Sequence, residues 1–153
     1  MNASIRFLGS VIICALALTT ALTTSADATV PAGRYTISAG SVTDTKTKLV
    51  WQQTPAPTLY IWSDAKTYCA GVGASLGGMG WRLPTLKELQ TIVDDSRGSP
   101  SIDPTAFPSM SSMGFWSSSP LVGSSSLAWL VSFDSGATAS IDITSTVAVR
   151  CVR

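Results

Sequence analysis

The fold of this chain is decided by the nine residues Trp81-Arg82-Leu83-Pro84-Thr85-Leu86-Lys87-Glu88-Leu89. Thr85 and Glu88 have the spacing of a capping box, in which the threonine hydroxyl accepts a hydrogen bond from the amide of residue 88 and the carboxylate accepts one from the amide of residue 85. This spacing predicts a helix that begins at Leu86. Pro84 keeps the preceding residue extended, so the chain should enter the core from a strand-like segment.

Apolar side chains recur at helical spacing after this cap, at Leu86, Leu89, Ile92 and Val93. Such a stripe predicts that one face of the helix is buried. The polar side chains between them fall on other faces, where they can remain in water.

The first 28 residues have the organisation of an export signal. Arg6 supplies the positive start, residues 7–22 form an apolar run, and Ala26-Asp27-Ala28 is a small-x-small cleavage site. A membrane anchor is the alternative, although a threonine-rich interruption leaves the run short of the roughly 20 apolar residues that span a bilayer. We therefore expect one domain, residues 29–153, that is secreted to the periplasm or the cell surface.

The cysteines also suit an exported protein. Cys14 belongs to the predicted leader, and the isoleucine before it does not suit a lipidation signal. Cys69 and Cys151 remain after processing, and an exported protein with two cysteines usually joins them. A disulfide that closes a loop of about 80 residues would contribute up to about 4.5 kcal/mol in the chain-entropy model. Two reduced, buried thiols are expected only if the chain is not exported.

Composition excludes several kinds of chemistry. Ten basic and nine acidic residues nearly cancel, and there is no histidine. The near balance of charge predicts no broad positive field that would attract polyanions. The lack of histidine removes Ser-His-Asp and Cys-His nucleophiles and histidine-ligated zinc. A glycosidase with paired carboxylates is arithmetically possible from Glu88, Asp94, Asp95 and Asp103. Because the cap explains Glu88 and the aspartates lie in turns, we expect no enzyme.

The segment before the central stretch predicts short strands and one helix. Residues 35–38 alternate as a strand does, and residues 42–52 predict two short strands around a polar turn, with Trp51 entering the core. Asp44 is a candidate ligand for a cation or a sugar, but an aspartate at this place more often caps its own turn. Ser63 is placed to cap a helix with Asp64 in its first turn.

That predicted helix continues with Ala65 and Cys69 on one face. The glycines at 71, 73, 77 and 78 then predict an irregular connection. Their amides are candidates for a phosphate cradle, but no Gly-Lys-Ser or G-x-G-x-x-G spacing follows a strand there.

Asp94, Asp95 and Asp103 form the densest group of acids in the chain. A calcium site needs more oxygen ligands than three scattered acids supply, although backbone carbonyls are able to complete one. All three lie in polar turn regions, and we assign no metal.

The final third predicts strands. Trp129, Val131 and Phe133 alternate with their neighbours, residues 137–143 pair back, and a last strand over 147–153 places Cys151 inward. The serine-rich pieces at 109–112 and 117–126 predict loops or polar edges.

Six segments in this order carry a resemblance to a known family: Val42-Thr43-Asp44 with Leu49-Val50-Trp51, Trp62-Ser63-Asp64-Ala65 with Cys69, Trp81 to Leu89, Ile102-Asp103 with Phe107-Pro108, Phe115-Trp116-Ser117-Ser118, and Val149-Arg150-Cys151-Val152-Arg153. Together they resemble the family of the C-terminal domain of Legionella collagen-like protein, in the C-type-lectin-like superfamily. Lys48 departs from the pattern, because such domains usually carry a glycine before the leucine.

The resemblance implies an α+β, C-type-lectin-like fold with two helices packed on a looped antiparallel β-structure and one disulfide. It also implies a surface adhesin that binds sulfated glycosaminoglycans, and a homotrimer. Calcium-dependent sugar sites of C-type lectins use Glu-Pro-Asn and Trp-Asn-Asp motifs, which this chain lacks, and it has no asparagine after Asn2. We therefore expect no calcium-dependent amide site and no cofactor.

The sequence is compatible with two functions. The first is a secreted, adhesive binding module for extracellular polysaccharide, with a shallow site formed by Arg82, Lys87, Trp116, Ser117, Ser118, Trp129 and Arg150. Its binding of an anionic polymer should weaken with salt and survive a chelator. The second is a structural or protein-interaction module of the cell envelope. A solvent-facing tryptophan beside two bases favours the first, and buried tryptophans with scattered bases favour the second.

Overall fold

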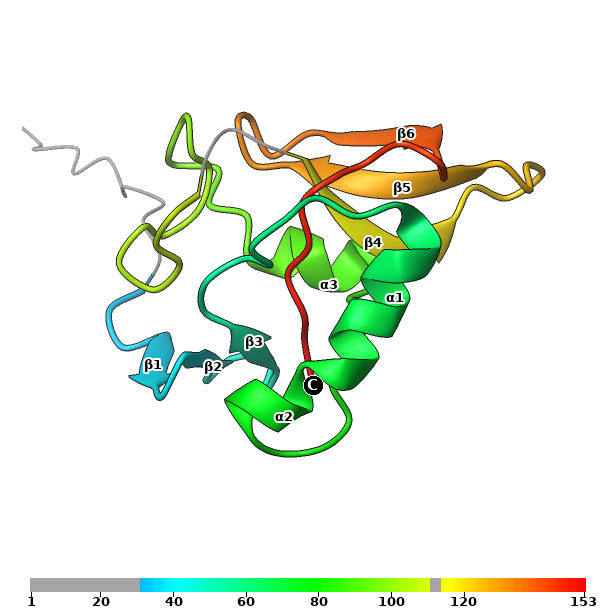
Figure 1. The fold of residues 1–153 in the computed structure, drawn as a ribbon. Helices are drawn as coiled ribbons and strands as arrows, with labels where there is room; N and C mark the ends of the chain where they lie inside the picture. Colours follow the sequence, from blue (N-terminus) through cyan, green and yellow to red (C-terminus); the bar gives the residue numbers. More distant parts are fainter. Residues whose placement is uncertain (1–30, 111–113) are drawn as a thin grey trace, which may run out of the picture.

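The computed structural model describes residues 31–110 and 114–153, so the predicted export signal of residues 1–28 lies outside the described part. The described part is an α+β domain with two antiparallel sheets of three strands each (Figure 1). The first sheet consists, in spatial order, of β1 (Tyr35–Ser38), β2 (Ser41–Asp44) and β3 (Val50–Gln52). The second consists of β4 (Gly114–Pro120), β5 (Leu127–Ser132) and β6 (Thr138–Asp142).

Three helices lie between the two sheets in the sequence: α1 (Trp62–Gly71), the single-turn α2 (Gly73–Leu76) and α3 (Leu86–Thr91). Within the two described ranges, none of these helices has the length and apolar character needed to cross a membrane.

Helix α3 begins where the capping box predicts. The hydroxyl of Thr85 accepts a 3.2 Å hydrogen bond from the amide of Glu88, whose carboxylate accepts one of 2.8 Å from the amide of Thr85. Leu89 and Ile92 are buried, which confirms the predicted inward face. The helix ends at Thr91, so Ile92 and Val93 follow it rather than forming its last turn.

Helix α1 starts two residues earlier than expected, and the prediction that Ser63 caps it is wrong. The N-cap position is Ile61, which has no side-chain acceptor. Tertiary contacts hold the start instead, because the backbone amide of Trp62 donates to the carbonyl of Ile143 and its indole donates to the carbonyl of Ser117. Asp64 does lie in the first turn.

The glycine-rich connection after α1 was expected to be irregular throughout, and this is wrong in part. Residues 73–76 form helix α2. Gly73 lies there because space is tight: a Cβ at this position would be 2.7 Å from the carbonyl oxygen of Gly78 and 3.1 Å from the ring of Trp81. Gly77 ends α2 in the left-handed region, with a φ of 72°.

Two groups of buried apolar side chains form the core. The first, here the α3 cluster, centres on Leu89, Ile92, Phe107, Phe115, Val131 and Phe133. The second, here the disulfide cluster, centres on Ala65, Cys69, Trp81, Trp116, Leu130, Val149 and Cys151. Successive residues of β5 belong to different clusters, because strand side chains alternate between faces. The central strand β5 is therefore covered on both faces.

The C-terminal residues 147–153 run extended through the middle of the molecule (Figure 1). They were expected to form a strand, but they pair through isolated bridges, including Tyr60 with Val147 and Trp51 with Val152. The amides of Gln52, Ala56 and Tyr60 donate in turn to carbonyls of this segment. The predicted disulfide is confirmed, with a Cα–Cα distance of 5.3 Å between Cys69 and Cys151.

Candidate functional site

Three of the side chains predicted from the sequence to contact a ligand are fully enclosed. Trp116, Ser117 and Arg150 each have 0% exposure. The Trp116 indole donates to the carbonyl of Tyr60 at 2.8 Å, and the Ser117 hydroxyl donates to the carbonyl of Trp129 at 2.7 Å. These side chains hold the fold together, so they are not available to a polysaccharide at the surface.

Arg150 was predicted to meet an anionic group of a ligand, but its side chain is enclosed. Its guanidinium has no carboxylate partner but donates to the carbonyls of Gln52 and Gln53, and it packs against the ring of Phe107. Burial lowers the pKa of Arg150 to about 9. Backbone carbonyls thus take the place of the anionic group that an arginine at this position was expected to meet.

The other four predicted residues reach the surface but do not form one site with the enclosed three. Arg82 is paired with Glu88 through two contacts of 2.8 and 2.6 Å. Lys87 is exposed on α3, whereas Ser118 and Trp129 are half-buried on β4 and β5. The sequence-predicted set is therefore spread over α3, two strands and the C-terminal segment.

The predicted acidic ligands serve as turn caps. Oδ1 of Asp44 accepts hydrogen bonds from the amides of Lys46 and Thr47, as expected for the turn-capping alternative, and its carboxylate also pairs with Arg34 at 2.8 Å. The carboxylate of Asp94 accepts from Ser96 and pairs with Arg97. Asp103 accepts from the amide of Thr105 at 2.8 Å, whereas Asp95 is exposed in the turn after α3. In the described ranges, no three of these acids or cysteines gather as metal ligands do.

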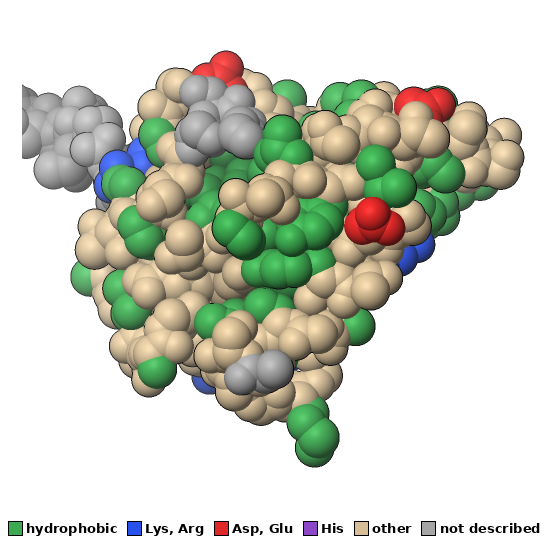
Figure 2. Space-filling view, in the orientation of Figure 1, with side chains coloured by type: hydrophobic (Ala, Val, Ile, Leu, Met, Phe, Trp, Pro, Cys, Tyr) green, Lys and Arg blue, Asp and Glu red, His purple; other side chains and the backbone are tan. Residues whose placement is uncertain are grey.

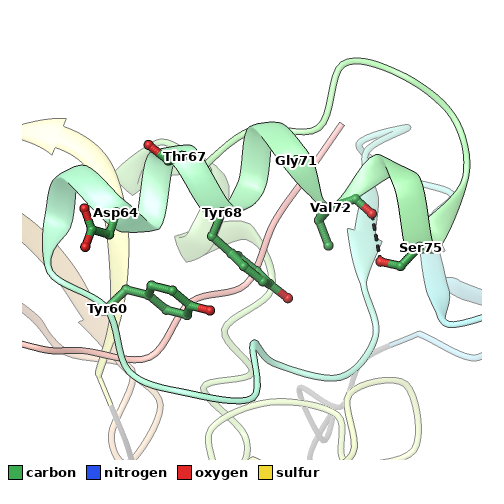
Figure 3. Close-up of a pocket in the computed structure, with 7 residues that line it drawn as sticks. All are labelled: Tyr60, Asp64, Thr67, Tyr68, Gly71, Val72 and Ser75. Carbon is green, nitrogen blue, oxygen red and sulfur yellow. Dashed lines mark hydrogen bonds between the residues drawn. The ribbon is translucent and has the colours of Figure 1, made fainter.

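A hollow of about 500 Å³ lies along helix α1, on a side that the sequence-based site did not include. We call it the tyrosine hollow. Its lining consists of Tyr60, Asp64, Thr67, Tyr68, Gly71, Val72 and Ser75 (Figure 3).

On the face of the molecule seen in Figure 2, apolar side chains gather at the centre and basic side chains appear at the margins.

The two tyrosine rings form the aromatic wall of this hollow. Their centroids are 5.0 Å apart, and the ring planes are tilted by 30°. Both rings project to the same side of α1 in Figure 3. Aromatic rings carry negative charge on their faces, so they attract positively polarised C–H groups and cations.

The fold fixes the position of Tyr60 through its backbone. Its amide donates to the carbonyl of Val147, and its own carbonyl accepts from the amide of Val147 and from the indole of Trp116. Three hydrogen bonds to buried residues leave this part of the chain little freedom. The backbone of Tyr60 is therefore fixed before any ligand arrives, and its ring packs against the disulfide cluster.

Tyr68 is fixed through helix α1. The next residue, Cys69, joins the helix to the C-terminal segment through the disulfide. The Tyr68 hydroxyl accepts a 2.9 Å hydrogen bond from Nε2 of Gln52. This bond uses an oxygen lone pair, so the hydroxyl proton of Tyr68 remains available to donate to a ligand.

The charge of the tyrosine hollow is negative. Among the described residues that line it, Asp64, exposed in the first turn of α1, is the only charged one. Nζ of the neighbouring Lys66 lies 3.1 Å from the ring centroid of Trp62. Burial lowers the pKa of Lys66. The Lys66 ammonium therefore contacts Trp62, which is not among the described residues that line the hollow.

One pattern in the sequence does indicate this face of α1. Asp64, Thr67, Tyr68 and Gly71 have the spacing i, i+3, i+4 and i+7, which places them on one helix face. This face carries a tyrosine and hydroxyl groups instead of the apolar stripe of a core face. The nearness of Tyr60, which precedes the helix, follows from tertiary pairing with Val147 and has no local signal.

A second, more apolar surface lies around Leu59, which is 46% exposed. Two adjoining hollows of about 310 and 260 Å³ share Leu59 and Ala148 in their lining. The first also includes Leu130 and Val147, and the second includes Pro55 and Pro57. No charged side chain lines either hollow in the described part of the chain.

The chain matches a known family. The model of the Lcl C-terminal domain family matches residues 40–153, which is most of the chain and includes both tyrosines of the hollow. No curated protein matches the chain.

Proposed function

The chain belongs to the Lcl C-terminal domain family, and from this premise we propose that it is a secreted, non-catalytic, adhesive module that binds an extracellular polysaccharide in the tyrosine hollow. The observation that carries the proposal is the fixed pair of tyrosine rings beside hydroxyl groups. A sugar ring has C–H groups on its faces and hydroxyls at its edge. Such a ring fits an aromatic wall with polar groups at the rim.

The hydroxyl groups along α1 suit a sugar in particular. Thr67 donates its proton to the carbonyl of Ser63, and Ser75 donates to the carbonyl of Val72. Their oxygens keep lone pairs that accept from sugar hydroxyls. The open shape of the hollow supports a site along a chain rather than a closed cavity for a small molecule.

Non-catalytic binding is supported by the chemistry of the chain. It contains no histidine, and both cysteines in the described part form the disulfide. One carboxylate, Asp64, lines the hollow, whereas the usual glycosidase needs two that face each other.

The family adds the finer parts of the proposal. We propose a C-type-lectin-like arrangement, in which the disulfide joins the first helix to the last extended segment. A homotrimer would present three hollows and raise the avidity for a polymer without any new contact. Export after removal of residues 1–28 would place this surface outside the cytoplasm.

A sulfated ligand has less support than the family resemblance suggests. Arg34, Arg82 and Arg97 are each paired with a carboxylate, and Arg150 is enclosed. Paired bases attract an anionic polymer less strongly, because their charge is already compensated.

The alternative function is an envelope module that binds a protein, and the apolar surface around Leu59 favours it. An exposed leucine beside prolines and two apolar hollows resembles the centre of a protein interface more than a sugar site. This surface has no charged lining residue among those described.

The test compares retention of the folded, disulfide-bonded protein on immobilised neutral glucan, chitosan and heparin. Tyr68→Ala removes half of the aromatic wall and should reduce retention at least tenfold, whereas Val122→Ala, at a 95% exposed position in a loop, should leave it unchanged. Near-ultraviolet circular dichroism checks that each variant is folded. If Leu59→Ser reduced binding to an envelope protein and no polysaccharide retained the wild type, the alternative would replace the proposal.

A further inference from the structure

We infer that the tyrosine hollow selects a glycan that carries protonated amino groups, such as a polymer of glucosamine, over its acetylated or sulfated counterparts. This inference rests on the proposed function and adds the charge class of the ligand. It follows from the position of Asp64 beside the two tyrosines.

Asp64 is placed to meet a positive group on a bound sugar. It is exposed in the first turn of α1 and lies next to Tyr60 in Figure 3. Within the described chain its carboxylate has one hydrogen-bond donor, the hydroxyl of Ser63 at 3.2 Å. A carboxylate has about four acceptor positions, so most of its capacity remains for a ligand.

No salt bridge to Asp64 occurs among the described residues. The salt bridges of the described residues involve Asp44, Glu88 and Asp94, and none involves Asp64. Nζ of Lys66 lies over the ring of Trp62 instead. A ligand ammonium is therefore the group that complements the charge of the hollow.

The aromatic wall also favours a positively charged ligand. An ammonium group near a tyrosine face is attracted by the ring quadrupole. Tyr60 and Tyr68 provide two such rings within 5.0 Å of each other, on the same side of the helix as Asp64. A sulfate group in this place would be repelled by both the carboxylate and the ring faces.

The experiment measures the affinity of the folded protein for three oligosaccharides of equal length: a glucosamine hexamer, an N-acetylglucosamine hexamer and a heparin hexasaccharide. Titration calorimetry is carried out at mildly acidic pH, where the sugar amine carries a proton. Glucosamine should bind about three- to tenfold more tightly than its acetylated form, since an exposed ion pair and a cation–π contact are each weak.

Two variants with the same charge change make the test specific. Asp64→Asn should lower the affinity for the glucosamine hexamer to that for the acetylated hexamer. Asp95→Asn, in the exposed turn after α3, should keep the preference.

The outcomes separate this inference from the proposed function. Equal binding of the two hexamers, unaffected by Asp64→Asn, would overturn the amine preference and leave the polysaccharide site in place. Tightest binding of the heparin hexasaccharide would also overturn it. If no oligosaccharide bound but a lysine-rich peptide did, both would fail and the hollow would be assigned to a protein partner.

Discussion

Nε2 of Gln52 donates a 2.9 Å hydrogen bond to the hydroxyl of Tyr68. The carboxamide oxygen of the same Gln52 accepts one of 3.2 Å from the amide of Cys151. One buried side chain therefore connects the wall of the tyrosine hollow to the segment that the disulfide holds. The stability of the fold and the geometry of the candidate site depend on the same few residues.

Removal of the disulfide should lower stability and loosen the hollow. The bridge closes a sequence separation of 82 residues, and the double variant Cys69→Ser/Cys151→Ser should lose roughly 2–5 kcal/mol of the free energy of unfolding. Urea denaturation of both proteins measures the difference. Thiol labelling of the denatured, non-reduced wild type should find no free thiol in the mature chain, and two labelled cysteines would contradict the assignment.

Truncation of Leu89 should cost more than loss of the helix cap. Leu89 is fully buried in the α3 cluster, so Leu89→Ala should cost about 2–5 kcal/mol by leaving a cavity. Thr85→Ala removes one cap acceptor and should cost roughly 0.5–2 kcal/mol. Chemical denaturation of the two variants gives the order, and a harmless Leu89→Ala would show that this cluster does not stabilise the fold as described.

Acid should weaken the fold through Glu88. The hydrogen bond from Arg82 lowers the pKa of Glu88 from 4.5 to about 2. Because the pKa is lower in the folded protein, this stabilisation is fully present above about pH 4.5 and is lost as the pH falls toward 2. Its size should be on the order of 1 kcal/mol, since water screens an ion pair at the surface.

The matched variant for this effect is Arg82→Gln, which keeps a polar side chain but removes the charge. The wild type should lose more stability than the variant between pH 5 and pH 2, as measured by urea denaturation at several pH values. Asp44 titrates in both proteins, so the difference between the two curves reports on Glu88. Parallel curves would show that the ion pair does not set the pKa.

Lys48 occupies a backbone conformation that favours glycine. Its φ is 66°, in the left-handed region that favours glycine. Lys48→Gly should raise the free energy of unfolding by up to about 1 kcal/mol, because the relief of strain exceeds the entropy that glycine loses on folding. Thermal denaturation checks this, with Lys46→Gly in the same turn as the control. A lower stability for Lys48→Gly would contradict the strain.

Local signals in the sequence predicted the parts of the fold that local interactions determine. The capping box at Thr85 and the inward face with Leu89 need only neighbouring residues, and both are confirmed. The start of α1 was misplaced by two residues because Trp62 bonds to residues far away in the sequence. No local pattern contains that information.

The candidate site was harder to predict for a related reason. A charged arginine and a serine in a polar run indicate a surface, yet Arg150 and Ser117 are enclosed because distant carbonyls accept their hydrogen bonds. Tyr60 and Tyr68 come together only when the C-terminal segment pairs with residues 50–60. The sequence therefore predicted the family correctly, but three of the side chains that it offered as ligand contacts, Trp116, Ser117 and Arg150, are enclosed.

The measurement that tests the central claim most directly is a nuclear magnetic resonance titration of the folded protein with a glucosamine hexamer. The proposal predicts that the largest shifts of backbone amides fall on residues 60–75, with smaller changes around Lys87 and Leu59. Tyr68→Ala should abolish these shifts, while amides remote from Tyr68 and its partner Gln52 keep their positions in the spectrum. Shifts centred on Lys87 and Trp129, or on the surface around Leu59, would contradict the assignment of the tyrosine hollow as the binding site.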